Sequence, residues 1–252
     1  MDLNDDQLLR YSRHILLPAV GVAGQTRMSE AAVLVVGAGG LGCPVALYLG
    51  AAGVGRLWVA DGDRVDLTNL QRQIGHTTSS IGENKALSLA RSVRAINPEI
   101  DIQPIPEALA GDALHAAVAA ADLVVDASDN FATRHAVNRA CVAQGKPLVS
   151  GAAIGFSGQL AVFDSRRPDS PCYHCLFSDQ GDEPELRCAE AGVFSPLVGI
   201  IGAMQAMEAL KYLAQAGAPL IGKLLLWDGV QSEARMLKVP RDPACPVCGS
   251  GR

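Results

Sequence analysis

The feature that most constrains this chain is a glycine-rich turn between a buried strand and an apolar helix. The turn reads Gly37-Ala-Gly39-Gly40-Leu41-Gly42; it follows a strand predicted at Val33–Val36 and opens a helix predicted from Leu41 to about Ala52. Its glycines permit a tight turn and a close approach of backbone N–H groups to phosphate oxygens at the helix N-terminus. The next predicted strand, Leu57–Ala60, is followed by Asp61, whose carboxylate can accept hydrogen bonds from ribose hydroxyls. The pattern therefore predicts a nucleotide site.

The turn alone does not separate ATP from NAD, and by itself it would first suggest an NAD-dependent dehydrogenase. No P-loop pattern ending in Gly-Lys-Ser or Gly-Lys-Thr occurs in the sequence. If the ligand is ATP, its phosphates must therefore be held by cations elsewhere in the chain.

Strands and helices alternate along residues 31–155, which predicts a Rossmann-like α/β fold with a mostly parallel sheet flanked by helices. We expect a single domain with a helical N-terminal arm over 1–30, a nucleotide-binding half over 31–155 and a second half over 156–252. In the second half we expect antiparallel strands at 159–164, 223–228 and 233–239. A long helix with Ser195 as its N-cap should run to about Gln215.

Composition narrows the class of protein. Of the 252 residues, 49 % are hydrophobic and 19 % are charged, so the chain can bury a sizeable aliphatic core. The net charge of −5 argues against nucleic acid as the main partner, because phosphate binding needs clustered cations. The first ten residues are unlike a signal peptide, and the longest uncharged stretch, 191–207, is short for a membrane span. We therefore expect a cytoplasmic protein without a membrane partner.

A second group of residues supplies the charge that a triphosphate needs. These polar and cationic residues follow strand ends or open helices, and they are Asp63, Asn69, Arg72, Gln73, Lys85, Asn130 and Arg134. Because ligands of open α/β sheets bind at the carboxyl ends of the strands, Asp61, Asp126 and Asp129 should converge there. Hydride transfer has no use for such a set, which favours ATP over NAD.

Some of these residues also have plainer interpretations. Lys85 could pair with Glu83 or with a neighbouring helix, and Arg13 could be a surface charge. Asp126 is expected to be a hydrogen-bond acceptor at a strand end rather than a metal ligand.

The cysteines are sorted by their spacing. Cys172-x-x-Cys175 and Cys245-x-x-Cys248 form two pairs, and four thiolates complete a closed, structural zinc site. A redox dithiol is the alternative. His174 is expected to be exposed and not to coordinate the metal. Cys43 and Cys141 lie on apolar helix faces and should be in the core.

The chain resembles the ThiF/MoeB family, the bacterial relatives of ubiquitin-activating enzymes. The resemblance runs essentially end to end and rests on Arg10-Tyr-Ser-Arg13, the glycine-rich turn, 66–73, Asp129-Asn130, 150–153 and the two cysteine pairs. It implies ATP-dependent adenylation of the C-terminal glycine of a ubiquitin-like sulfur-carrier protein by a homodimer that carries zinc. Residues 156–252 would then be the carrier-binding and zinc half.

The resemblance also implies roles for individual residues. Gly40 and Asp61 would contact the adenosine and ribose, and Asp129 would bind Mg²⁺. Arg13 would reach the active site of the opposite subunit. Asn69, Arg72 and Lys85 would hold the triphosphate. Further nucleotide-binding candidates are Gly37, Gly39, Gly42, Asp63, Gln73 and Asn130.

This chemistry is consistent with the residues present. A C-terminal carboxylate is already deprotonated at neutral pH, so no general base is needed. The obstacle is an anion attacking a polyanion, and Mg²⁺, arginine and lysine reduce it by neutralising charge and aligning the groups.

Several alternatives stay open. A cysteine at the position of Cys188 attacks the adenylated carrier or joins it covalently in some family members and is dispensable in others. The carrier could be ThiS-like or MoaD-like, for thiamine thiazole or molybdopterin biosynthesis. Because no sulfurtransferase-like extension follows, sulfur should come from a separate sulfurtransferase or cysteine desulfurase. An NAD-dependent oxidoreductase and a non-catalytic nucleotide-binding scaffold are the alternative functions.

Overall fold

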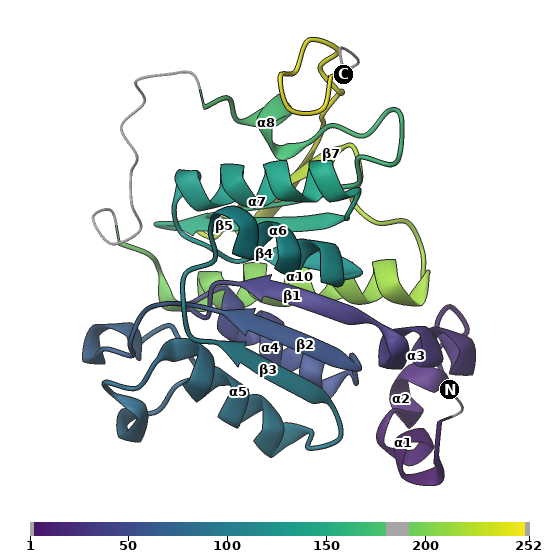
Figure 1. Ribbon diagram of the computed structural model, residues 1–252, viewed down its shortest axis with the longest axis vertical. Helices are drawn as coiled ribbons and strands as arrows, with labels where there is room; N and C mark the ends of the chain where they lie inside the picture. Colours follow the sequence, from purple (N-terminus) through teal and green to yellow (C-terminus); the bar gives the residue numbers. More distant parts are fainter. Residues whose placement is uncertain (1–2, 180–191, 250–252) are drawn as a thin grey trace.

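The computed structural model describes residues 3–179 and 192–249, and its centre is a mixed sheet of eight strands (Figure 1). The strand order is β3-β2-β1-β4-β5-β6-β7-β8; neighbours are parallel from β3 to β5 and antiparallel from β5 to β8. The predicted fold class is confirmed. The strands are β1 (Ala32–Val36), β2 (Arg56–Ala60), β3 (Asp101–Ile105), β4 (Leu123–Asp126), β5 (Leu148–Ile154), β6 (Ser157–Phe163), β7 (Lys223–Asp228) and β8 (Glu233–Lys238).

Helices cover both faces of the sheet, and two separate hydrophobic clusters result (Figure 1). One cluster joins α4, α5 and α10 to the sheet, and the other joins α6 and α7 to its opposite face. The helices are α1 (Asp5–Arg10), α2 (Ser12–Ile15), α3 (Gly21–Glu30), α4 (Gly42–Ala51), α5 (Lys85–Ile96), α6 (Gly111–Ala120), α7 (Phe131–Gln144), α8 (Tyr173–Leu176) and α10 (Ser195–Ala214), with short 3₁₀ turns η1 (Leu67–Asn69) and η2 (Thr78–Ser80).

The sequence of β1 explains how it lies between the two clusters. Val33 and Val35 belong to the α4 side, whereas Leu34 and Val36 belong to the α6 side. Successive side chains of a strand point to opposite faces, so an unbroken aliphatic run fits a strand that is covered on both sides. Every residue of β1 is buried, as this arrangement requires.

The structure corrects the predicted cap of the long helix and defines two further boundaries. Ser195 is the first residue of α10 and not its N-cap, because its hydroxyl donates to the Gln71 carbonyl instead; Phe194 occupies the cap position. The N-terminal arm contains three helices, of which the first is capped by Asn4. β5 continues to Ile154 because β6 pairs with it along its whole length.

The helix α10 overlaps the uncharged stretch 191–207 and runs beyond it to Ala214, past the charged residues Glu208 and Lys211. An 18-residue window of this 20-residue helix has a mean hydropathy of 1.3, so by length and composition alone the helix could cross a membrane. Half of that window is buried inside the protein, against α4, β5 and β6 among others. Within the part of the chain that the structure describes, α10 therefore packs as a core helix.

Candidate functional site

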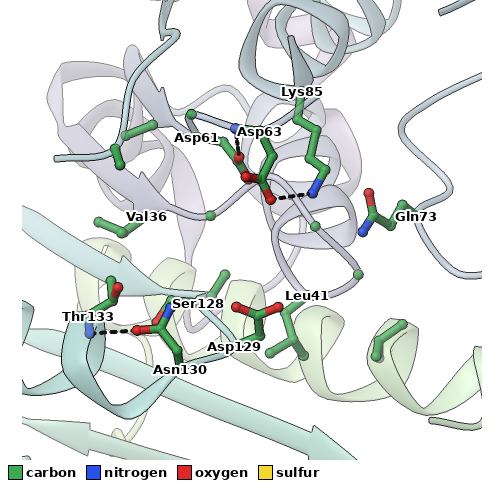
Figure 2. Close-up of a pocket in the computed structure, with 18 of the residues that line it drawn as sticks. Val36, Leu41, Asp61, Asp63, Gln73, Lys85, Ser128, Asp129, Asn130 and Thr133 are labelled. Atoms are coloured by element: carbon green, nitrogen blue, oxygen red, sulfur yellow. Dashed lines mark hydrogen bonds and ion pairs between the residues drawn. The ribbon is translucent and has the colours of Figure 1, made fainter. Parts of the chain in front are cut away.

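A pocket opens at the carboxyl ends of β1 and β4, where the chain leaves the sheet toward opposite faces (Figure 2). From β1 the chain enters α4 on one face, and from β4 it enters α7 on the other. Such a switch point leaves a crevice that open α/β sheets use for ligands. The pocket is the one that the glycine-rich turn predicted.

The glycine-rich turn packs so tightly that side chains are excluded at two positions. Gly37 has φ +99°, and a Cβ there would lie 2.7 Å from the Ala127 carbonyl oxygen at the end of β4. A Cβ on Gly42 would lie 1.9 Å from the Gly37 carbonyl oxygen. The turn thereby directs the N-terminus of α4 at the pocket, where backbone N–H groups and the helix dipole favour an anion.

Asp61 holds the turn from the neighbouring strand. Its carboxylate accepts hydrogen bonds from the backbone N–H groups of Ala38, at 2.7 Å, and Asp63, at 2.8 Å. Burial raises the pKa of Asp61, and these two N–H donors act in the opposite direction. Asp61 lines the pocket as predicted, and part of its carboxylate already has this structural role.

The sequence reasoning missed His76, whose imidazole contacts the backbone of the turn. Its Nε2 lies 2.9 Å from the Ala38 carbonyl oxygen, and its Nδ1 lies 2.9 Å from Ser88 Oγ. A carbonyl can only accept, so Nε2 carries the proton and Nδ1 accepts from the serine. Burial lowers the pKa of His76, which favours this neutral form. Because the peptide is trans, the N–H of Gly39 points away from His76.

Lys85 is placed by its neighbour Asn84, which the sequence reasoning also missed. Asn84 caps α5 by accepting from Ala86 N, and its amide donates to the carbonyls of Asp61 and Asp63. Lys85 therefore begins its helix beside the Asp61–Asp63 loop, and its Nζ lies 2.9 Å from Asp63 Oδ2 (Figure 2). Lys85 lines the pocket as predicted.

The plainer interpretation of Lys85 is wrong. Glu83 pairs instead with Arg91, at 2.7 Å and 2.8 Å. The ammonium of Lys85 is therefore directed by Asp63 at the rim of the pocket rather than by a partner on its own helix.

The 66–73 segment contributes two pocket residues and one structural residue. Arg72 lines the pocket and uses one N–H for the Thr68 carbonyl, at 3.0 Å, out of the five that a guanidinium has. Gln73 also lines it, and its buried Oε1 has no hydrogen-bond partner among the residues that the structure describes. Asn69 is absent from the lining because its Oδ1 accepts from Asp66 N and closes η1.

Two aspartates near the end of β4 differ in exposure: one carboxylate is buried and the other is exposed. Asp126 is fully buried and accepts from the hydroxyls of Ser128, at 2.6 Å, and Ser150, at 3.3 Å, as its interpretation as a strand-end acceptor predicted. Burial raises the pKa of Asp126. Asp129 is exposed and lines the pocket opposite Asp63 and Lys85 (Figure 2). Asn130 lies there too, and it caps α7 by accepting from Thr133 N at 2.8 Å.

Like Asn69, the predicted site residue Arg13 does not line this pocket. Arg13 is exposed on α2, in the helical arm that precedes the amino-terminal end of β1, whereas the pocket lies at the carboxyl end of that strand. Cys188 lies outside the described residues.

The four paired cysteines meet as their spacing predicted. The Sγ–Sγ distances are 3.9 Å for Cys172–Cys175, 3.8 Å for Cys172–Cys245 and 3.4 Å for Cys175–Cys248. Four thiolates around a tetrahedral zinc would lie about 3.8 Å apart, whereas a disulfide needs about 2.0 Å. The donor set therefore fits zinc, and Asn138 Nδ2 donates to Cys172 Sγ from α7. Cys43 and Cys141 are buried in the core as expected.

The chain is similar to known proteins over nearly its whole length. The profile of the ThiF family matches residues 11–247. A sulfur carrier protein adenylyltransferase of Thermus thermophilus is 48 % identical over 97 % of this chain and 92 % of its own length. A molybdopterin-synthase adenylyltransferase of Salmonella typhimurium is 44 % identical, with 98 % and 99 % covered. A sulfur carrier protein ThiS adenylyltransferase of Escherichia coli is 46 % identical, with 98 % and 97 % covered.

Longer relatives and solved structures extend the comparison. The chain spans 56 % of the length of an "adenylyltransferase and sulfurtransferase MOCS3" of Anopheles gambiae, with 46 % identity over 98 % of this chain. Escherichia coli MccB superimposes with a TM-score of 0.84 at 22 % identity, over 99 % of this chain and 76 % of that one, which shows the shared fold.

The packing of the turn gives a direct test of the pocket. Gly42→Ala should lower affinity for a non-hydrolysable ATP analogue with Mg²⁺ by about tenfold or more in calorimetric titration, because the added methyl overlaps the Gly37 carbonyl. The control is Gly199→Ala within α10, where nothing lies within 4 Å of the new Cβ. It should bind normally and stabilise the fold by about 0.5–1 kcal/mol. Unchanged binding by Gly42→Ala would contradict the assignment.

Proposed function

The chain belongs to the ThiF family, and on that premise we propose that it uses ATP to adenylate the C-terminal glycine of a ubiquitin-like sulfur-carrier protein. The observation that carries the proposal is the meeting of Arg72, Lys85 and Asp129 around the glycine-rich turn at the switch point. Relatives at 44–48 % identity over nearly the whole chain are named adenylyltransferases, two of them of sulfur carriers. An NAD-dependent oxidoreductase has no comparable support.

The reaction needs charge control rather than a base. A carboxylate oxygen of the carrier attacks the α-phosphorus of ATP, the bond to the bridging oxygen of the β-phosphate breaks, and pyrophosphate leaves with the electron pair. Arg72 and Lys85 would hold phosphate oxygens from the side of α5 and the 66–73 segment. Mg²⁺, held through Asp129, would neutralise phosphate charge. The N-terminus of α4 would bind a further phosphate oxygen.

The buried amide of Gln73 supports a role in positioning the nucleotide. A buried oxygen without a partner is costly, and a donor group of the ligand would remove that cost. Asn69 has no such support, because its side chain closes η1. We therefore keep Gln73 as a nucleotide-binding residue and assign Asn69 the role of shaping the segment that presents Arg72.

We propose that the four-cysteine site holds a structural zinc ion. The sulfur–sulfur distances fit a tetrahedron, and four protein ligands leave no position for a reactive water. The ion would connect 172–175, next to α7, with 245–248 at the other end of the second half. Its role would be to fix the C-terminal segment rather than to take part in catalysis.

We also propose a homodimer in which Arg13 completes the site of the partner subunit. An apolar groove between the N-terminal arm, α4 and α10 supports it, with exposed side chains at Leu17, Tyr48 and Met207. Arg13 is adjacent to the groove residue His14, so a second chain on this face would place it near the neighbour. Within one chain Arg13 lies in the helical arm that precedes β1 and does not line the pocket.

The adenylated carrier needs one further reaction before it holds sulfur. An acyl-adenylate is an activated mixed anhydride, so a sulfur nucleophile must attack it to give a thiocarboxylate. A separate sulfurtransferase or cysteine desulfurase remains the prediction for its source. Names in both the thiamine and the molybdopterin branches occur among the relatives, and the carrier chemistry that both share is what we propose.

Two cations on the same helix test the electrostatic role of the pocket. Lys85→Met should lower carrier-dependent exchange of radioactive pyrophosphate into ATP by about 10²–10³, because a preorganised cation at the phosphates is lost. Arg91→Met is the matched control, since Arg91 pairs with Glu83 at the surface and should keep near-normal exchange. Exchange by Lys85→Met at the wild-type rate would favour a scaffold over an enzyme.

Mixed dimers test the position of Arg13. Arg13→Ala and Lys85→Met should each lower exchange by about 10²–10³ when expressed alone. Mixed at equal amounts under conditions of subunit exchange, they should recover about a quarter of wild-type exchange, because half of the dimers carry one intact composite site. If Arg13 acts within its own chain, no activity returns.

A further inference from the structure

A second cluster of metal-binding side chains lies outside the nucleotide pocket, beside the cysteines. It consists of His135 on α7, His174 on α8 and Asp179 just after α8. One donor atom from each lies within 4.8 Å of the other two. The expectation that His174 is exposed is wrong: 7 % of it is accessible, and 5 % of His135.

Each of the two buried imidazoles has one nitrogen without a hydrogen-bond partner among residues 3–179 and 192–249. These are the Nδ1 atoms of His135 and His174, whereas buried polar atoms normally have a partner. The rings pack edge to face with centroids 5.5 Å apart, and His135 packs in the same way on Tyr173, at 5.2 Å. These contacts fix the planes of the rings but give neither Nδ1 atom a hydrogen bond.

The carboxylate of Asp179 completes the cluster and also pairs with Arg139. Asp179 Oδ1 lies 3.6 Å from His174 Nδ1, and its Oδ2 lies 3.4 Å from an N–H of Arg139. The side chain is 44 % exposed, so it can move toward the imidazoles while water still reaches the site. The ion pair with Arg139 is also exposed, and such pairs contribute about 1 kcal/mol or less.

We propose that His135, His174 and Asp179 bind a second divalent zinc ion, distinct from the one in the four-cysteine site. Zinc takes imidazole nitrogen and carboxylate oxygen at about 2.0–2.2 Å, so the three donor atoms would close to roughly 3.3 Å from one another. Three protein ligands leave one position for water. This ion should therefore exchange more readily than one held by four thiolates.

Because of where the cluster lies, a bound ion would link two parts of the chain. Asp179 directly precedes 180–191, the stretch that contains Cys188, whereas His135 lies on the helix that opens with Asn130 at the nucleotide pocket. A bound ion would connect the start of that stretch to α7. The inference rests on the cluster alone and does not depend on the proposed function.

Metal counting tests the site in the full-length protein. After saturation with zinc alone and gel filtration, wild-type protein should hold one more ion per chain, by mass spectrometry of the metal, than His135→Gln or Asp179→Asn. Dialysis against a mild chelator should remove that ion from wild type and equalise the three proteins. The matched control His115→Gln changes a half-buried histidine on α6 and should keep the wild-type count.

The experiment distinguishes the second zinc site from the four-cysteine site because it compares the zinc count of wild type with that of each variant. One ion fewer in His135→Gln supports the second site whatever the cysteines hold, provided that circular dichroism shows the variant is folded. Asp179→Asn, at an exposed position, gives the same comparison with less risk to folding. Equal zinc counts in wild type and in both folded variants would overturn the proposal.

Discussion

The close packing of the glycine-rich turn against the end of β4 is the constraint on which the rest of the site depends. Gly37 approaches the Ala127 carbonyl and Gly42 approaches that of Gly37 at distances where no Cβ fits. These contacts bring the start of α4 to the switch point between β1 and β4. Asp61 then accepts from the N–H of Ala38, and His76 donates to the carbonyl of the same residue. The backbone of the turn is therefore preorganised by the chain itself.

Around this turn, charged side chains have two kinds of role. The carboxylates of Asp61 and Asp126 accept hydrogen bonds from the chain, and burial raises the pKa of each. Lys85, which pairs with Asp63, and the exposed Asp129 line the pocket, as Asp61 also does. Preorganised charges cost little rearrangement when the reacting phosphate arrives, which is the main way in which such sites accelerate transfer.

A feature of the fold or the site could be predicted from the sequence where the residues that determine it are close together in the chain. The aliphatic run of β1 and the glycine spacing define their own structure, so the sheet and the position of the pocket beside the turn were predicted correctly. His76 and Asn84 were missed because their partners, Ala38 and the Asp61–Asp63 loop, become neighbours only when α5 packs beside the turn. Ser195 was taken for a cap because a distant carbonyl, that of Gln71, competes for its hydroxyl.

The central claim is that the carrier attacks the inner phosphorus of ATP, and labelled nucleotide tests it most directly. Wild-type enzyme with Mg²⁺ and a carrier ending in Gly-Gly is given ATP labelled at the α-phosphate or, in a parallel reaction, at the γ-phosphate. We expect α-label on the intact carrier, lost when its last glycine is removed, and γ-label only in pyrophosphate. Transfer of γ-label to the carrier, or no label on it at all, would contradict the account.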